Sequence, residues 1–305
     1  MTIIGTDSFE LALRAHAVEV EALLRRLLDD RPLSGEIARP ERLMAAMRHG
    51  ALNGGKRLRP FLVLESAALF GAQSESALHV AAALECVHCY SLVHDDLPAM
   101  DDDDIRRGQP TVHKAFDEAT AILAGDSLLT YAFDILAQGA PMLGAETSVE
   151  LIGGLARAAG AGGMAGGQAL DLEAERSRPN EDGIIRLQAM KTGALIRYAC
   201  EAGAILAGAP AADRERMAEF GLAIGLAFQL ADDLLDLTAS ADALGKATGK
   251  DQAAGKATLA ALYGVDWAKK QLTGLVAQAE ALLDPYGPRA AVLKAAARFA
   301  ANRRH

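Results

Sequence analysis

The sequence is poor in cysteine. Its three cysteines are an odd number, which provides no disulfide framework and suits a reducing compartment. Cys86 and Cys89 have the CxxC spacing of a metal or redox pair, but no second CxxC exists and both lie in an apolar helical run. The sequence therefore predicts neither a disulfide-bonded scaffold nor a metal site at this pair.

Positive charge and a hydrophobic leader are also lacking. The net charge of −9 disfavours nucleic acid as a partner, because binding its backbone needs a basic face. A small phosphorylated substrate remains compatible, since divalent cations can reverse the local sign of charge. The first ten residues have no basic region or long apolar core, and charges interrupt the apolar stretches. We expect no signal peptide, no membrane span and a cytoplasmic protein.

Alanine, leucine and glycine dominate instead, while aromatic residues make up 5% and β-branched runs are scarce. This composition favours an all-α protein. No domain boundary stands out, so we interpret residues 1–305 as one domain. Between residues 139 and 167 the glycines alternate with alanine and leucine, which favours close helix–helix approach over a linker. Apolar periodicity predicts helices over residues 8–30, 61–70, 75–97, 112–137, 181–209, 213–237 and 258–301.

The most informative stretch holds six aspartates between Asp95 and Asp104, at the end of an apolar helical run and just before Arg106 and Arg107. Carboxylates this close repel one another unless cations neutralise them, and they are the hard ligands through which Mg²⁺ commonly reaches substrate phosphates. The arginines suit phosphate directly. An isolated pair of aspartates would be a solvated turn, but a second cluster follows on an apolar helix, at Asp232, Asp233 and Asp236.

Two basic segments accompany the aspartates. Residues 53–60, NGGKRLRP, place three cations within four residues on a glycine turn, which predicts either a compact anion site or a basic loop without a ligand. In residues 190–195, MKTGAL, a glycine interrupts an apolar helix at a cost of about 1 kcal/mol relative to alanine, so it indicates a local break or a close contact. The glycines of residues 245–258 do not form a P-loop, because their spacing differs and no strand precedes them.

Acidic clusters on separate helices of a bundle are a common way to build a metal site. A ferritin-like di-iron site would need glutamates and Glu-x-x-His pairs, which these aspartates do not supply. Aspartates near lysine and arginine point instead to Mg²⁺ that binds a polyphosphate and neutralises charge on a departing diphosphate. The flanking aliphatic helices predict an apolar interior. Together these features suggest ionisation of an allylic diphosphate.

The order and spacing of six motifs resemble the trans-isoprenyl diphosphate synthase (polyprenyl synthetase) family, and most of all its bacterial members that make farnesyl diphosphate. The resemblance implies an all-α helical bundle around a central cavity, which forms a homodimer. It also implies that the protein condenses isopentenyl diphosphate head to tail with dimethylallyl and then geranyl diphosphate. The motifs are GGKRLRP (54–60), DDLPAMD (95–101), DDIRRG (103–108), GGQALDL (166–172), KTGALI (191–196) and FQLADDLLD (228–236).

The resemblance also implies roles for individual residues. It implies three Mg²⁺ ions with substrate bound: Asp95 and Asp101 would ligate two and Asp232 the third, with Asp236 acting through water. Asp96 and Asp233 complete the candidate metal set. Released pyrophosphate takes the final proton, so no protein base is required. The other implied residues are Arg106, Lys191 and Lys246 for the allylic diphosphate, Lys56, Arg59, His88 and Arg107 for isopentenyl diphosphate, Thr192 and Gln229 near the developing cation, and Lys256 near a closing segment.

Product length depends on the residues before the first motif. Tyr90 lies five residues before Asp95, where family members that make the C15 product commonly place an aromatic ring as the floor of the cavity, with Ser91 leaving room beside it. The resemblance therefore implies farnesyl diphosphate. The alternatives are a geranyl or geranylgeranyl diphosphate synthase, a class I terpene cyclase, a non-catalytic subunit of a heteromeric prenyltransferase, and a plain Mg²⁺- or Ca²⁺-binding helical protein.

Overall fold

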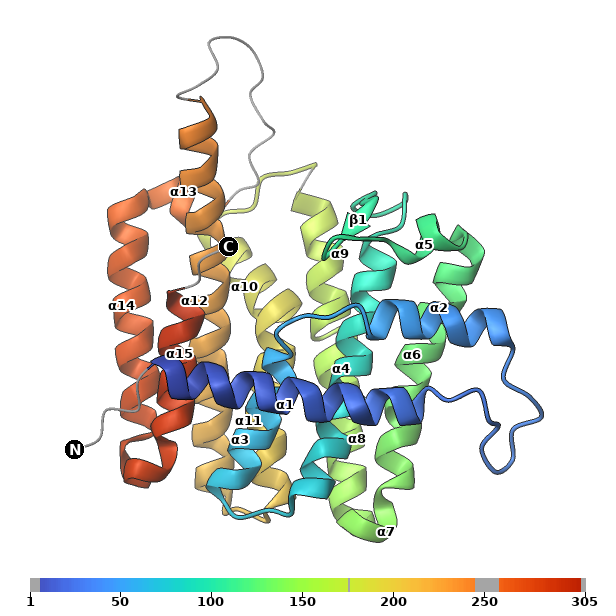
Figure 1. Cartoon of the computed structure of the whole chain (residues 1–305). Coiled ribbons are helices and arrows are strands. Elements are labelled where there is room, and N and C mark those ends of the chain that lie inside the picture. The colour runs from blue at the N-terminus through green and yellow to red at the C-terminus, as the bar shows by residue number, and fades with distance from the viewer. Residues whose placement is uncertain (1–5, 175, 245–257, 303–305) are drawn as a thin grey trace. The chain divides into compact units, whose positions relative to one another are not determined.

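The computed structural model describes residues 6–174, 176–244 and 258–302, and helices dominate them, which confirms the predicted all-α class (Figure 1). Among these residues the only strands are β1 (Ile105–Arg106) and β2 (Gln109–Pro110), which pair antiparallel. The helices are α1 (Thr6–Leu27), α2 (Glu41–Ala51), α3 (Leu58–Leu69), α4 (Ser74–Asp95), α5 (Val112–Ala115), α6 (Glu118–Gln138), α7 (Ala140–Leu143), α8 (Ala145–Ala159), α9 (Met164–Ala174), α10 (Glu181–Gln188), the π-helix η1 (Ala189–Gly193), α11 (Ala194–Leu206), α12 (Ala211–Leu244), α13 (Leu259–Tyr263), α14 (Val265–Leu282), the 3-10 helix η2 (Asp284–Ala290) and α15 (Ala291–Ala301).

Contacts between residues divide the chain into two compact units. The chain passes from one unit to the other four times, inside α1, α8 and α11 and once between Gly208 and Ala209, in the connection from α11 to α12. Unit 1 comprises Met1–Phe9, Gly154–Ala204 and Ala209–His305, and unit 2 comprises Glu10–Gly153 and Ile205–Gly208.

The core of unit 2 is built around α4, which packs against α2, α3 and α6 (Figure 1). Residues 80–87 of α4 are all buried, as expected for a helix that is apolar on every side. Glu85 is the one acidic residue in this stretch, and a buried carboxylate requires a partner. The same helix ends at the first Asp-rich motif, so the core of the unit fixes where that motif begins.

Two helices of unit 2, α4 and α6, are long and apolar enough to cross a membrane by length and composition. This finding corrects the expectation that charges keep every apolar stretch too short for a span. In α4, 67% of the apolar window is buried inside the structure, and in α6 the share is 39%. The core helices of soluble proteins pass the same test, so these two helices are weak evidence for a membrane span.

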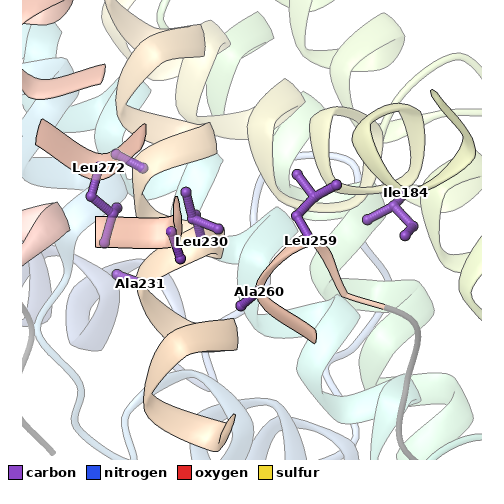
Figure 2. Close-up of a cluster of buried hydrophobic side chains, with 8 residues drawn as sticks. Ile184, Leu230, Ala231, Leu259, Ala260 and Leu272 are labelled. Carbon is purple, nitrogen blue, oxygen red and sulfur yellow. The ribbon is translucent and has the colours of Figure 1, made fainter. Parts of the chain in front are cut away.

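The core of unit 1 surrounds α12, which packs against η1, α13, α14 and α15. In one part of this core, Leu230 of α12, Leu259 of α13 and Leu272 of α14 are buried in a single cluster with Ile184 of α10 (Figure 2). Four alanines complete the cluster, and their small side chains suit closely approaching helices. Because α12 is continuous here, its acidic residues are held on a rigid element.

Glycines in unit 1 mark points where backbones meet. A Cβ atom added to Gly167 of α9 would lie 2.1 Å from the backbone nitrogen of Lys191, and one added to Gly225 of α12 would lie 2.9 Å from the Cα atom of Gly193. Close helix approach is thus confirmed at these positions. Gly193 also ends the π-helix η1, so it serves both the predicted break and the predicted contact.

Several predicted helices are interrupted in the structure. The helix predicted over residues 112–137 is two helices, and Asp117 between them caps α6 by accepting a hydrogen bond from the Thr120 N–H at 2.7 Å. Contacts from Arg42 and Thr120 lower the pKa of Asp117 to about 2. The helix predicted over residues 258–301 is broken at Gly264, which has a φ of 87° between α13 and α14, and again by η2, where Gly287 has a φ of 57°. Apolar periodicity continues across these breaks, which is why the sequence did not show them.

Candidate active site

The first Asp-rich motif begins at the end of α4 and continues in a turn. Asp95 and Asp101 are six residues apart, a spacing that a continuous helix would place on different faces. The helix ends at Asp95 instead, and Pro98, which has no backbone N–H, lies in the following turn. The Asp101 N–H then donates to the Asp95 carbonyl at 2.8 Å. The turn therefore brings the backbone of the two predicted metal ligands back together.

Asp96 of this motif is directed toward an arginine. It is only 3% exposed, and its Oδ1 atom accepts a hydrogen bond from Arg106 Nε at 2.6 Å and forms an ion pair with Arg106 Nη2 at 2.5 Å. Burial raises the pKa of Asp96, although the guanidinium opposes this shift. Arg106 lies in β1, just before the hairpin turn Arg107-Gly108, where both residues have positive φ as a type I′ turn requires.

In the glycine-turn loop, residues 53–60, one of the three predicted cations is turned into the core. Arg57 has φ 51°, and its side chain is fully buried, where Nη1 donates to Glu85 Oε1 at 2.6 Å and Nη2 contacts Glu21 at 3.2 Å. Nη2 also donates to the Ala51 carbonyl at 2.7 Å. Arg57 is therefore a structural anchor, and of the three cations it is not available to an anion. Sequence reasoning missed its partner Glu85, although an acid within an apolar run was a usable signal.

The residues predicted to bind isopentenyl diphosphate gather beside this loop. Arg59 Nη1 donates to His88 Nε2 at 3.3 Å, and the Arg107 guanidinium donates to the Asn53 side chain and the Gly54 carbonyl. Lys56, in the same loop, is exposed. Burial, and then the positive charges of Arg59 and Arg107, hold the pKa of His88 well below its usual range. His88 is thus a neutral acceptor among cations.

The second Asp-rich motif lies entirely within α12. Asp232 and Asp236 are four residues apart, so they share one face of the helix. Asp233 is 7% exposed and accepts from Gln188 Nε2 at 2.7 Å through Oδ2 and from Gln229 Nε2 at 3.3 Å through Oδ1. Burial raises the pKa of Asp233. All of these partners belong to unit 1.

The predicted cation-stabilising residues join this network. The Thr192 hydroxyl of η1 donates to Gln229 Oε1 at 3.0 Å. Beside it, Lys191 Nζ donates to Asp171 Oδ2 of α9 at 2.5 Å, and both side chains are about three-quarters buried or more. A lysine held next to a carboxylate is oriented rather than free to move. The sequence did not assign a role to Gln188 or Asp171, although Asp171 lies in the GGQALDL motif.

A separate acidic group lies after the first motif. Asp102, Asp104 and His113 each place one ligand atom within 4.8 Å of the others, so this group could hold a metal ion. Asp104 already pairs with Lys114 at 2.8 Å, and both aspartates are exposed. The group is therefore a weaker candidate than the two motifs.

The residues predicted to set product length lie on α4. The ring of Tyr90 contacts the ring of His94 edge to face, with centroids 5.7 Å apart, and burial raises the Tyr90 pKa. His94 in turn contacts the Ile122 carbonyl of α6 at 3.0 Å, and a Cβ atom at Gly125 would collide with it. Ser91 donates to the His88 carbonyl at 2.8 Å. Tyr90 is thus supported by a side chain packed tightly on α6.

The structure brings most of the predicted site residues into two groups. Lys56, Arg59, His88, Asp95, Asp96, Asp101, Arg106 and Arg107 lie in unit 2, and Lys191, Thr192, Gln229, Asp232, Asp233 and Asp236 lie in unit 1. Lys246 and Lys256 lie outside the described residues. Cys86 and Cys89 are buried thiols, and burial with the nearby Glu85 raises the pKa of Cys89 to about 12, which disfavours a redox or metal role.

An all-helical chain with two aspartate motifs, each beside basic side chains, defines a class of enzymes that bind diphosphates with divalent metal ions. The side chains of both motifs fit Mg²⁺, which prefers the hard oxygen atoms of carboxylates. A turn brings the backbones of Asp95 and Asp101 together, and Asp232 and Asp236 share one face of α12. Comparison with known proteins gives the family: the chain belongs to the polyprenyl synthetases, whose sequence model matches residues 40–285. The resemblance inferred from the motifs is confirmed.

Individual relatives are similar over most of their length. Farnesyl diphosphate synthase of Escherichia coli is 48% identical over 240 residues, 77% of this chain and 79% of the relative. Geranylgeranyl diphosphate synthase of Cyanophora paradoxa is 42% identical over 265 residues, 87% of this chain and 88% of the relative. The crystal structure of an FPP/GFPP synthase from Zymomonas mobilis has a TM-score of 0.86 and 42% identity, covering 97% of this chain and 99% of that chain. The names of these relatives all describe synthases of isoprenyl diphosphates, and the products that they name differ in chain length.

Proposed function

We propose that the protein is a Mg²⁺-dependent farnesyl diphosphate synthase. It would condense isopentenyl diphosphate with dimethylallyl diphosphate and then with geranyl diphosphate, releasing pyrophosphate each time. The observation that carries the proposal is the convergence in unit 2 of Arg59, His88 and Arg107 beside the Lys56 loop, with the first Asp-rich motif immediately after the same helix. A plain metal-binding protein would not need these cations.

Each residue group has a proposed task. When bound, Mg²⁺ would neutralise the charge that develops on the departing diphosphate; Asp95 and Asp101 would hold it in unit 2, and Asp232, with Asp236 through water, in unit 1. Arg59 and Arg107 would bind isopentenyl diphosphate, with Lys56 beside them in the same loop. The neutral ring of His88 would accept from Arg59 and so orient its guanidinium.

In unit 1, Asp171 would orient Lys191 toward the allylic diphosphate. The oxygen atoms of Thr192 and Gln229 are proposed to face the developing cation, because oxygen dipoles fixed in advance stabilise positive charge without reorganisation. Arg106 would serve the allylic diphosphate from beside Asp96. Lys246 and Lys256 remain proposed substrate-binding residues on the basis of family resemblance alone.

Wider properties follow from the same proposal. The protein would be a cytoplasmic homodimer without nucleic-acid partners, as the resemblance and the net charge suggest. A single domain over residues 1–305 is supported by the division between the units, because three of its four crossings fall inside helices, whereas domain boundaries fall in exposed linkers.

The test is an assay with labelled isopentenyl diphosphate and each of dimethylallyl, geranyl and farnesyl diphosphates, with and without Mg²⁺, in which products are separated by chain length. We expect C15 from the first two and no extension of farnesyl diphosphate. Lys56→Ala should raise the KM for isopentenyl diphosphate, with Lys114→Ala as the matched control, since Lys114 pairs with Asp104 outside the loop. Absence of condensation with every allylic substrate would overturn the proposal in favour of a non-catalytic subunit.

Tyr90→Ala tests product length separately. Loss of a ring that is supported by His94 should open the floor and shift the product from C15 to C20 or longer. Tyr131→Ala removes an aromatic ring from α6 of the same unit and is the control, with C15 expected unchanged. A C15 product from Tyr90→Ala would show that another residue forms the floor.

A further inference from the structure

We infer that Asn53 is a positioning residue of the anion site in unit 2. Its side-chain oxygen holds the guanidinium of Arg107 on the glycine-turn loop, where that guanidinium meets the diphosphate of isopentenyl diphosphate. The inference rests on the proposed function, in which Arg107 binds this substrate. It adds a residue that lies just before the GGKRLRP motif and to which the motif assigns no role.

The side chain of Arg107 crosses from the hairpin turn between β1 and β2 to the glycine-turn loop. Its Nη1 atom donates to Asn53 Oδ1 at 3.1 Å and to the Gly54 carbonyl. A Cβ atom added to Gly55 would lie 2.6 Å from Arg107 Cζ, so the guanidinium lies directly on the glycine backbone. These contacts hold the guanidinium against the loop, although Arg107 itself is an exposed residue.

The start of the loop presents oxygen atoms to two arginines. The Ala51 carbonyl accepts from the buried Arg57 at 2.7 Å, and Asn53 Oδ1 and the Gly54 carbonyl accept from Arg107. Oxygen atoms repel an anion, so a diphosphate that approaches this side of the loop needs a positive charge between itself and these oxygens. The guanidinium of Arg107 supplies that charge only while it is held in place.

The conformation of Arg107 is costly, which is why it requires acceptors on the loop. Its φ of 53° lies in the left-handed region that residues other than glycine rarely adopt. Holding a long exposed side chain in one rotamer also costs conformational entropy. After burial, the charges of Arg59 and Arg107 lower the pKa of His88, so the held guanidinium lies near the other predicted ligands of isopentenyl diphosphate. Asn53 thus stabilises Arg107 beside this substrate site.

The test is a double-mutant cycle between Asn53 and Arg107. Asn53→Leu, Arg107→Ala and the double variant are assayed for kcat and for the KM of isopentenyl diphosphate and of geranyl diphosphate. Asn53→Leu removes the acceptor oxygen while keeping a side chain of similar size. Gln138→Leu is the matched control, because it removes an exposed amide of α6 in the same unit, whose partner is Asp134.

We expect Asn53→Leu to raise the KM for isopentenyl diphosphate about three- to tenfold, the effect of one hydrogen bond, and to leave the KM for geranyl diphosphate unchanged. Arg107→Ala should raise the same KM about tenfold or more, because charge-assisted hydrogen bonds are stronger. In the Arg107→Ala background, Asn53→Leu should add less than about twofold, since it has no guanidinium left to position. Effects that simply multiply, or a rise in both KM values, would overturn the inference.

Calorimetry provides a readout that does not depend on turnover. Binding of isopentenyl diphosphate to each of the four proteins of the cycle is measured without Mg²⁺, and the affinities should follow the same pattern as the KM values. If the wild-type protein binds isopentenyl diphosphate but catalyses no condensation, the proposed function fails, and these affinities still decide the role of Asn53. A wild-type protein that does not bind isopentenyl diphosphate would overturn the inference together with the anion site.

A second variant keeps the inference testable if Asn53→Leu does not fold. Asn53→Ala removes the same oxygen without placing an apolar side chain of equal size at this half-buried position. It should raise the KM for isopentenyl diphosphate in the wild-type background and have little effect beside Arg107→Ala. A folded Asn53→Ala variant with a wild-type KM for isopentenyl diphosphate would contradict the inference.

Discussion

The two Asp-rich motifs use the same residue type on different backbones. In unit 1, Asp232 and Asp236 are separated by four residues and remain on one continuous helix. In unit 2, Asp95 and Asp101 are separated by six, and the chain leaves the helix in a turn that returns Asp101 to Asp95. The comparison shows that two extra residues between the predicted ligands change the local structure, while the backbone of Asp101 still returns to that of Asp95.

The two motifs also differ in what holds the aspartate at their centre. Arg106, a cation, binds Asp96, whereas two neutral amides bind Asp233. Unit 2 contains a second buried ion pair, in which Arg57 of the glycine-turn loop (residues 53–60) contacts Glu85 of α4. The second aspartate of the motif is therefore held by a charged partner in unit 2 and by neutral amides in unit 1, while each unit also contains an ion pair that is at least mostly buried, Arg57–Glu85 in unit 2 and Lys191–Asp171 in unit 1. Four predictions test this contrast.

The largest effect is expected from breaking the buried charge of unit 2. Glu85→Leu would leave Arg57 buried with Glu21 as its remaining acidic partner, and it should destabilise the protein by about 3–5 kcal/mol in urea unfolding. Adding Arg57→Met removes the uncompensated charge, so the double variant should recover most of that loss. A double variant as unstable as Glu85→Leu would show that the shape of the pair, not its charge, is what matters.

The next effect concerns the close backbone contact of unit 1. Gly167→Ala would place a Cβ atom 2.1 Å from the Lys191 nitrogen, so η1 must move, and overpacking of this kind costs about 1–3 kcal/mol. Thermal unfolding measures the cost, and the KM for the allylic diphosphate should rise as Lys191 shifts. Gly162→Ala is the control, because no atom lies within 4 Å of its added Cβ. Equal behaviour of the two variants would refute the packing argument.

A smaller effect is expected at the ion pair of unit 1. Asp171→Asn should raise the KM for the allylic diphosphate about tenfold, because a hydrogen bond to a charged group is worth about 1.5–3 kcal/mol. Asp104→Asn in unit 2 removes an exposed pair with Lys114 and should leave the melting temperature almost unchanged, because solvent screens an exposed pair. If Asp171→Asn leaves every KM unchanged, Lys191 does not depend on this carboxylate.

The smallest effect is a pH dependence in unit 2. The hydrogen bond to Glu65 at 2.8 Å, together with Glu19, raises the pKa of His16 above its usual value of 6.5. A raised pKa in the folded state contributes stability that is fully present below about pH 6.5 and is lost as pH rises through the folded pKa. The melting temperature of wild type relative to His16→Gln should therefore be higher at about pH 6 than at about pH 9. A difference in melting temperature between the two proteins that stays constant across this pH range would contradict the prediction.

The sequence predicted the family and its reaction better than it predicted what each charged residue does within a cluster. It singled out the aspartates of both motifs as candidate metal ligands, because such ligands are recognised by residue type and spacing. It could not separate Arg57 from Lys56 and Arg59, since the positive φ that turns Arg57 inward arises from the folded loop and from Glu85. The long apolar helices were predicted in order, but α2, α8 and α9 were given no bounds. The break at Asp117 was missed because apolar residues continue on both sides of it.

The buried cysteines make the two units separately observable. Cys86 and Cys89 lie in α4 of unit 2, and Cys200 lies in α11 of unit 1, all of them as buried thiols. A buried thiol reacts only when its surroundings open. Alkylation of the native protein followed by peptide mass spectrometry would therefore time the opening of each unit on its own. No reporter group has to be introduced, because the chain already carries one in each half.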